Sequence, residues 1–215
     1  MAKNNLADLT LTFVSLERSI VDEVAKAFPS TDIRYKNVGA EHKNITSCAP
    51  HDCIVSPANS FGQMDGGIDA SLSRMLMKHY DVEYIGRKVR KVIAEEYFGE
   101  QPVGTCILLE TDNHSFPYLA HAPTMTTPRT VTGTLNAYYA FKAVLSSVVN
   151  YNRHAHKDRK IKSILTTTFA TGCGEVPLAD ALQQMKKAYD VVYEGIEPTW
   201  GGAGILVTEL NGLLL

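Results

Sequence analysis

The chain has 215 residues, 45% of them hydrophobic and 20% charged, and its formal net charge at pH 7 is -2. This length and apolar fraction favour one globular domain, spanning residues 1–215, with a sizeable core. The near-neutral balance gives no support to non-specific nucleic-acid binding, which depends on clustered positive charge, and we expect no sequence-specific nucleic-acid partner.

The N-terminal residues, the lack of a long apolar window and the cysteines bear on the cellular compartment. The first residues, MAKNN, lack the apolar stretch of a signal peptide, and no window approaches the ~20 apolar residues that span a membrane. The four cysteines, at positions 48, 53, 106 and 173, are predicted to be reduced thiols because three of them lie beside or within apolar strands or a loop. We therefore expect a cytoplasmic protein with no membrane partner.

Strand and helix patterns alternate along the chain. In order, we predict a strand at 9–16, a helix at 20–28, a short strand at 32–36, a polar, turn-rich segment at 37–50, a buried strand from Cys53, and helices at 67–79 and 82–98. The second half predicts strands at 105–110 and 118–122, a long helix from about 132 to 150, a strand ending at Thr168, a helix at 178–194 and a final strand at 205–210. Such alternation is typical of an α/β fold in which helices cover both faces of a mixed or parallel sheet.

The most informative segment joins the strand from Cys53 to the helix at residue 67. Ser56 ends the apolar run, and the glycine pair at 66 and 67 allows the backbone to approach a ligand so closely that any side chain would clash. Asn59 and Asp69 are the polar groups at its rim. The same residues also fit an ordinary strand-to-helix connection with Asp69 as a first-turn helix carboxylate.

A second glycine-containing loop, residues 171–175, follows a predicted strand and precedes a predicted helix. Backbone N–H groups in a small-residue loop at a positive helix terminus suit a diphosphate. Because open α/β sheets bind ligands outside the ends of their strands, we expect the two loops to hold one extended anionic ligand between them.

Four segments, in order, resemble the macro domain, a module that binds ADP-ribose. The segment VSPAN at 55–59 aligns with the family motif V-N-A-A-N, and DGGID at 65–69 aligns with G-G-G-V-D. Before them, NIT at 44–46 aligns with D-I-T. After them, TGCGEVP at 171–177 matches T-G-x-x-x-x-P. The resemblance covers roughly residues 9 to 193. It implies a three-layer α/β/α sandwich with a central mixed sheet.

The resemblance also implies roles for individual residues. Asn44 and Ile45 would lie beside the adenine. The diphosphate would be held by the loop formed by Thr171, Gly172, Cys173, Gly174 and Glu175. The distal ribose would face Asn59, Gly66 and Gly67, with Ala58 and Ile68 completing the ligand-binding set.

In the hydrolytic MacroD-like branch, the asparagine matching Asn59 orients the distal ribose and the aspartate matching Asp69 places or activates a water. The expected reaction is release of ADP-ribose from an ADP-ribosylated carboxylate side chain or from a small ester such as O-acetyl-ADP-ribose. The implied partner is thus ADP-ribose or an ADP-ribosylated substrate. No metal and no cofactor is needed.

Several positions depart from the family pattern. Asn44 replaces the usual aspartate, which weakens the hydrogen bond expected from the adenine amino group, although an amide oxygen can still accept one. Ser56 replaces the first asparagine, Asp65 replaces a glycine, and Glu175 stands where a glycine is usual. These changes indicate a divergent member, whose substrate is open to alternatives such as ADP-ribose 1''-phosphate.

Three function classes remain open: an ADP-ribosyl hydrolase, a module that binds ADP-ribose or a related nucleotide without turnover, and an interaction domain. His42, Cys48, His51 and Cys53 resemble a zinc set, but Cys53 begins a strand expected to be buried and the spacing fits no standard zinc site well. Cys173 is either a nucleophile of lowered pKa or a small loop residue, and His121 is expected to be a hydrogen-bonded core histidine.

Overall fold

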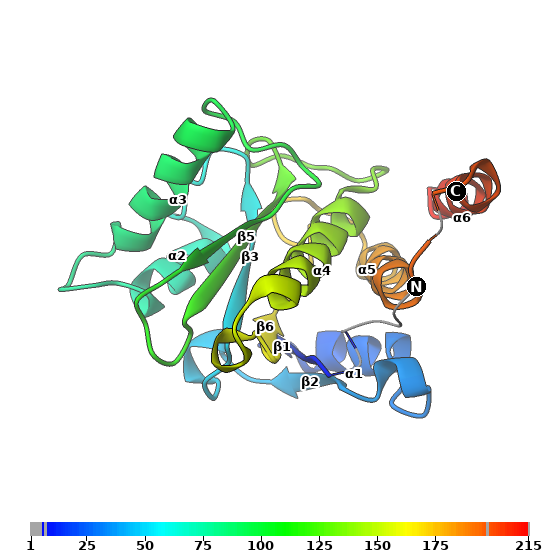
Figure 1. Ribbon diagram of the computed structural model, residues 1–215, viewed down its shortest axis with the longest axis horizontal. Helices are drawn as coiled ribbons and strands as arrows, with labels where there is room; N and C mark the ends of the chain where they lie inside the picture. Colours follow the sequence, from blue (N-terminus) through cyan, green and yellow to red (C-terminus); the bar gives the residue numbers. More distant parts are fainter. Residues whose placement is uncertain (1–5, 7, 197, 215) are drawn as a thin grey trace.

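The computed structural model describes residues 6, 8–196 and 198–214, and in it six strands form one mixed sheet between helical layers (Figure 1). The strands are β1 (Thr10–Ser15), β2 (Val38–His42), β3 (Cys53–Asn59), β4 (Ile107–Glu110), β5 (Tyr118–Met125) and β6 (Ser163–Thr166). Their order is β2-β1-β6-β3-β5-β4. Every neighbouring pair is parallel except β4 and β5, which are antiparallel. The predicted α/β/α sandwich with a mixed sheet is confirmed.

Helices cover both faces of this sheet. One face packs against α2 (Gly67–Met75) and α3 (Tyr84–Glu96), and the other against α1 (Arg18–Ala27), α4 (Asn136–His154) and α5 (Leu178–Glu194). Three short 3-10 turns complete the connections: η1 (Ile33–Tyr35), η2 (Ile45–Ser47) and η3 (Lys157–Arg159).

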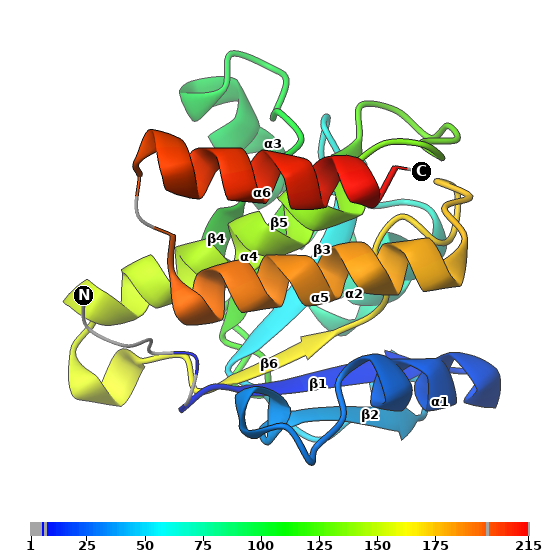
Figure 2. The same ribbon diagram turned by 90° about the vertical axis from the view of Figure 1, so that its right-hand side faces the viewer.

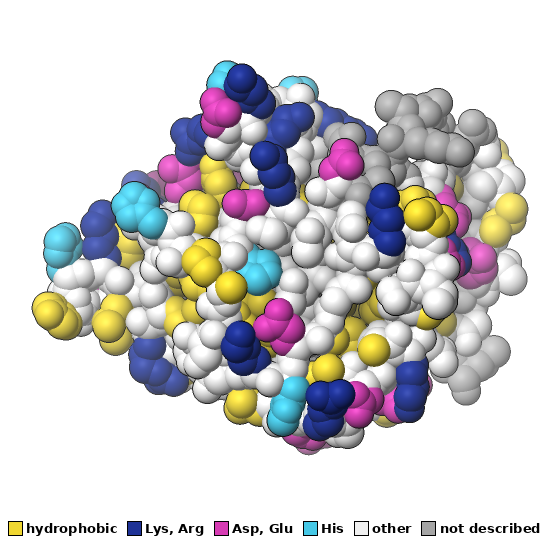
Figure 3. Space-filling view, turned by 90° about the horizontal axis from the view of Figure 1, so that it is seen from below, with side chains coloured by type: hydrophobic (Ala, Val, Ile, Leu, Met, Phe, Trp, Pro, Cys, Tyr) yellow, Lys and Arg dark blue, Asp and Glu magenta, His cyan; other side chains and the backbone are white. Residues whose placement is uncertain are grey.

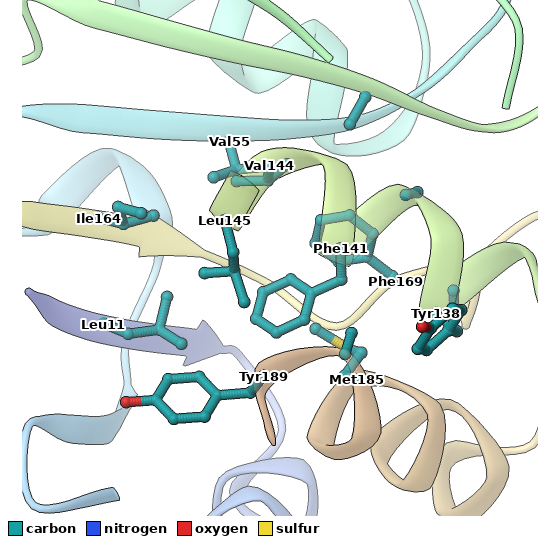
Figure 4. Packing of buried hydrophobic residues seen from close by; sticks show 14 of the residues in the cluster. Leu11, Val55, Tyr138, Phe141, Val144, Leu145, Ile164, Phe169, Met185 and Tyr189 are labelled. Atoms are coloured by element: carbon teal, nitrogen blue, oxygen red, sulfur yellow. The ribbon is translucent and has the colours of Figure 1, made fainter. Parts of the chain in front are cut away.

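The larger core lies between the sheet and the pair α4 and α5 (Figure 4). Phe141 of α4 packs edge-on against Phe169, with ring centroids 5.3 Å apart. In the same cluster, Tyr189 of α5 packs edge-on against Phe28. All four side chains are almost completely buried. Aromatic burial of this kind stabilises the position of β6 and of the loop that follows it, which forms part of the site described below.

Two predicted strands were wrong. Residues 33–35 form η1 because the Asp32 carboxylate accepts the Arg34 N–H at 2.9 Å and closes a tight turn, and the strand β2 lies further along, inside the segment predicted to be turn-rich. The segment 205–210 belongs to a helix, α6 (Trp200–Gly212), whose first turn is capped by Thr199.

Helix α6 lies beside α5 on the outside of the sandwich (Figure 2). Leu206 and Leu210 of α6 and the C-cap residue Leu213 pack against the core, and their spacing of four and three residues is the period of a helix and not of a strand. An ion pair between Lys187 of α5 and Glu209 connects the two helices. Within the described residues, no helix has both the length and the apolar character that a membrane crossing would require.

Candidate functional site

A cavity of about 530 Å³ opens where the parallel strands β1, β6, β3 and β5 end. This is the edge at which open α/β sheets bind ligands. The predicted site residues that line it are Asn44, Ile45, Ala58, Asn59, Gly66, Gly67, Ile68, Asp69, Thr171, Gly172, Cys173 and Gly174. Glu175 is exposed and does not line it. The two glycine loops, more than a hundred residues apart in sequence, therefore meet around one cavity.

Residues that the sequence analysis did not predict also line this cavity. They include the end of β1 with the residues after it (Val14, Ser15, Leu16 and Glu17), Lys43, and the end of β5 with a residue after it (Thr124, Met125 and Pro128). No local motif marks them. They line the cavity only because β1 and β5 flank β6 and β3 in the sheet order.

Asp69 is the one buried carboxylate of the cavity. Asp69 lies in the first turn of α2 and is 7% exposed. The hydroxyl Oγ of Ser56, on β3, donates a hydrogen bond to Asp69 Oδ1 at 2.5 Å. Burial raises the pKa of Asp69 to about 6, the Ser56 hydrogen bond acts in the opposite direction, and the nearby charge of Asp65 raises it further. A carboxylate with such a pKa exchanges protons near neutral pH, which suits a general base.

His121 lies beside Ser56 in the sheet, as its register partner on β5. The ring is completely buried, its Nδ1 lies 2.7 Å from Gln101 Oε1, and burial lowers its pKa to about 3. The expected hydrogen-bonded core histidine is confirmed. Its Nε2 is buried without a partner among the described residues.

Asn59 lines the cavity, but its side chain also holds the turn that follows β3. Its Oδ1 accepts the N–H groups of Phe61 and Gln63, at 3.1 and 3.3 Å, and its Nδ2 donates to the Gln63 carbonyl at 2.9 Å. One amide hydrogen therefore remains for a ligand.

The loop after β6 has the geometry of an anion cradle. A Cβ on Gly174 would lie 2.4 Å from the Ala170 carbonyl oxygen, so the tight path of the loop excludes a side chain there. The Glu175 N–H donates to the Gly172 carbonyl at 2.9 Å, and the Val176 N–H donates to the Ala170 carbonyl at 3.0 Å. Within the described chain, the N–H groups of residues 171–174 have no hydrogen-bond partner, so they are available to phosphate oxygens.

At the other end of the cavity, Asn44 caps η2. Its Oδ1 accepts both the backbone N–H of Thr46 at 3.0 Å and the Thr46 hydroxyl at 2.9 Å. Ile45 is buried beside it, and the backbone of Lys43 bonds to Ser15 at the end of β1. This part of the cavity therefore combines aliphatic side chains with the Asn44 amide and the polar residues Ser15 and Lys43.

The residues that resemble a zinc set do not form one metal site, because they have other partners in the fold. His42 bonds to the Leu16 carbonyl at 2.9 Å, His51 to Thr12 at 3.1 Å, and Cys53 is buried in β3, where burial raises the pKa of its thiol. Across the described residues, no three His, Cys, Asp or Glu side chains lie close enough to share a metal ion.

The basic run at residues 87–91 lies on α3, where acidic neighbours neutralise it. Arg87 pairs with Asp81, and Arg90 pairs with Glu83 at 2.8 Å. Acidic side chains are also interspersed among basic ones over the face seen in Figure 3. Such mixed charge is typical of a solvated surface.

Comparison with known proteins identifies relatives. A family model described as Macro domain matches residues 55–185, more than half of the chain. A search of curated protein sequences finds no significant match. The solved macrodomain of Mycobacterium tuberculosis DarG is 16% identical, aligns over 70% of this chain and 89% of its own, and gives a TM-score of 0.54.

Two further solved structures are similar. An Oceanobacillus iheyensis macrodomain, a glycine-to-valine mutant with ADPR, is 15% identical over 99% of this chain and 97% of its own, with a TM-score of 0.55. The Trypanosoma brucei macrodomain in complex with ADP is 16% identical over 78% of this chain and 62% of its own, with a TM-score of 0.54. At these identities the likeness shows a shared fold.

Proposed function

This chain belongs to the macro domain family, and we propose that it binds ADP-ribose in the cavity at the strand ends and hydrolyses ADP-ribosyl esters there. The substrates would be ADP-ribosylated carboxylate side chains or a small ester such as O-acetyl-ADP-ribose. Two similar structures carry ADPR and ADP, which supports a ligand of this chemical class.

The unpartnered N–H groups of residues 171–174 support the placement of the diphosphate. They belong to a loop that has no room for a side chain at Gly174. On the facing side, Gly66 is the N-cap of α2 and Gly67 begins its first turn, whose N–H groups lack intrahelical partners by nature. Two sets of N–H donors would thus hold the anionic part of the ligand.

The observation that carries the hydrolase proposal is the buried Asp69 carboxylate in this cavity, hydrogen-bonded to Ser56. Ionised, it would accept a proton from a water molecule whose oxygen attacks the ribose carbon of the glutamate or aspartate ester, while the bond from that carbon to the ester oxygen breaks and the carboxylate leaves with its electrons. Orientation of the water and the ester by the cavity would supply most of the acceleration, with the single base contributing the remainder.

The proposal is tested by calorimetric titration of ADP-ribose and by release of ADP-ribose from a protein modified on glutamate. We expect micromolar binding by the wild type, no binding by Gly172→Glu, and binding without release by Asp69→Asn. The asparagine variant is the matched control because its amide oxygen can keep the Ser56 hydrogen bond. Absence of binding at millimolar ADP-ribose would reject the whole proposal.

A second candidate is a module that binds ADP-ribose without turnover. The Asn59 side chain favours it, because three of its hydrogen bonds hold the turn at 61–63 and leave one N–H to orient a ribose. Binding without release by the wild type itself would select this function.

A further inference from the structure

The Asn44 amide offers the cavity a hydrogen-bond donor and no acceptor. A backbone N–H can only donate, so the amide atom that faces the Thr46 N–H must be Oδ1. That oxygen also accepts the Thr46 hydroxyl, so both of its lone pairs are engaged. Within the described part of the chain, Nδ2 of Asn44 has no acceptor. The amide oxygen that was expected to accept a bond from adenine is therefore engaged by Thr46 in this structure.

The surroundings of Asn44 suit a flat heterocycle. Val14 and Ile45 are buried, Leu16 is 69% exposed at the rim, and all three line the cavity with Asn44. If the proposed function holds, the diphosphate lies at residues 171–174 and the ester lies at Asp69, which leaves this end for the purine. The edge of the purine would then meet the Asn44 NH₂ group.

We propose that this cavity favours an ADP-ribose-like ligand whose purine carries a carbonyl at position 6, as guanine and hypoxanthine do, over one that carries an amino group there. The inference rests on the proposed function. At position 6, adenine presents an amino donor, which cannot bond to the Asn44 NH₂ group, whereas the O6 of guanine or hypoxanthine is an acceptor; the neighbouring N7 acceptor is common to these purines and does not distinguish them. A donor that faces a donor leaves both groups without their hydrogen bond.

The test compares inosine diphosphate ribose with ADP-ribose by calorimetry, for the wild type and for Asn44→Asp. We expect the wild type to bind the inosine ligand about five- to tenfold more tightly, the difference that one hydrogen bond makes. Asn44→Asp should reverse the order, because one carboxylate oxygen keeps the Thr46 cap and the other becomes an acceptor for the adenine amino group. Aspartate caps helices as well as asparagine does, so the variant should fold normally.

A second readout does not depend on affinity differences. The side-chain NH₂ resonances of Asn44 in a ¹⁵N-labelled protein should shift downfield with the inosine ligand and remain nearly unchanged with ADP-ribose. Equal affinities in the wild type, tighter binding of ADP-ribose, or an Asn44→Asp variant with unaltered preference would each overturn the inference while leaving the proposed function intact. Binding of neither ligand would instead refute the proposed function, and this inference with it.

Discussion

Ser56 Oγ donates to Asp69 Oδ1 at 2.5 Å and joins the middle of β3 to the first turn of α2. The two residues are 13 positions apart, and the glycine pair lies between them. The bond stabilises the ionised form of a carboxylate whose burial favours the protonated form. Ser56, which replaces the family's first asparagine, therefore lowers the pH at which the Asp69 carboxyl ionises.

Removal of this bond should move the pH dependence of the reaction. In Ser56→Ala, burial acts without the opposing hydrogen bond, so the pKa of Asp69 should rise above its value of about 6. We expect the ascending limb of the pH–rate profile for ADP-ribose release to move to higher pH by about one unit. Titration of the Asp69 ¹³Cγ resonance checks the same pKa without turnover. An unchanged titration midpoint in both measurements would show that the bond does not control ionisation.

The raised pKa of Asp69 also predicts a stability effect. A carboxyl with a folded-state pKa of about 6 and an ordinary value of 3.8 stabilises the fold most below pH 3.8, and this contribution is lost as pH rises through about 6. Asp69→Asn does not titrate. Its free energy of unfolding relative to the wild type should therefore increase by up to about 3 kcal/mol between about pH 4 and pH 8. Urea unfolding of both proteins at the two pH values measures this, and a constant difference would contradict it.

The contribution of His121 to the free energy of unfolding should depend on pH in the opposite direction. Burial lowers its pKa from 6.5 to about 3, so its contribution to stability is complete above pH 6.5 and is lost as pH falls toward 3. We expect wild type to lose about 3 kcal/mol more than His121→Gln between about pH 6.5 and pH 4. Parallel unfolding curves would refute this. If the variant does not fold, ¹⁵N spectra of the wild-type ring at about pH 5 should still show a neutral imidazole.

Local sequence patterns predicted the two glycine loops because each loop is built from consecutive residues. The helix at 178–194 was predicted with the bounds that α5 has, since its apolar period and the preceding Pro177 are both local signals. Every predicted site residue except Glu175 lines the cavity. The roles given to these residues remain predictions.

The features that sequence analysis missed depend on tertiary neighbours. Leu16 and Pro128 line the cavity because β1 and β5 flank the central strands. No local sequence pattern predicts that strand order. In the tail, the apolar run at residues 205–210 has the composition of a strand, whereas Leu206 and Leu210 pack against the core from within a helix. The saturation of Asn44 Oδ1 by Thr46 likewise became visible only with the geometry of η2.

Gly174 and Gly172 form a matched pair for testing whether the shape of the loop controls binding. A Cβ at 174 would lie 2.4 Å from the oxygen and 3.0 Å from the carbon of the Ala170 carbonyl, and the backbone there is held by the bond from Val176 N–H to Ala170 O at 3.0 Å. At 172, a Cβ would meet nothing within 4 Å, and the backbone needs no positive φ.

Gly174→Ala must displace the 170–176 loop, because backbone atoms cannot move aside as a flexible side chain can. We expect a loss of about 2 kcal/mol in the free energy of unfolding and a loss of ADP-ribose affinity of at least about tenfold. Gly172→Ala should stay within about 0.5 kcal/mol of wild type in stability. Urea unfolding and calorimetric titration of the three proteins measure both effects. Equal stability of the two variants would mean that the loop adapts freely and that its N–H groups are not fixed in place before the ligand binds.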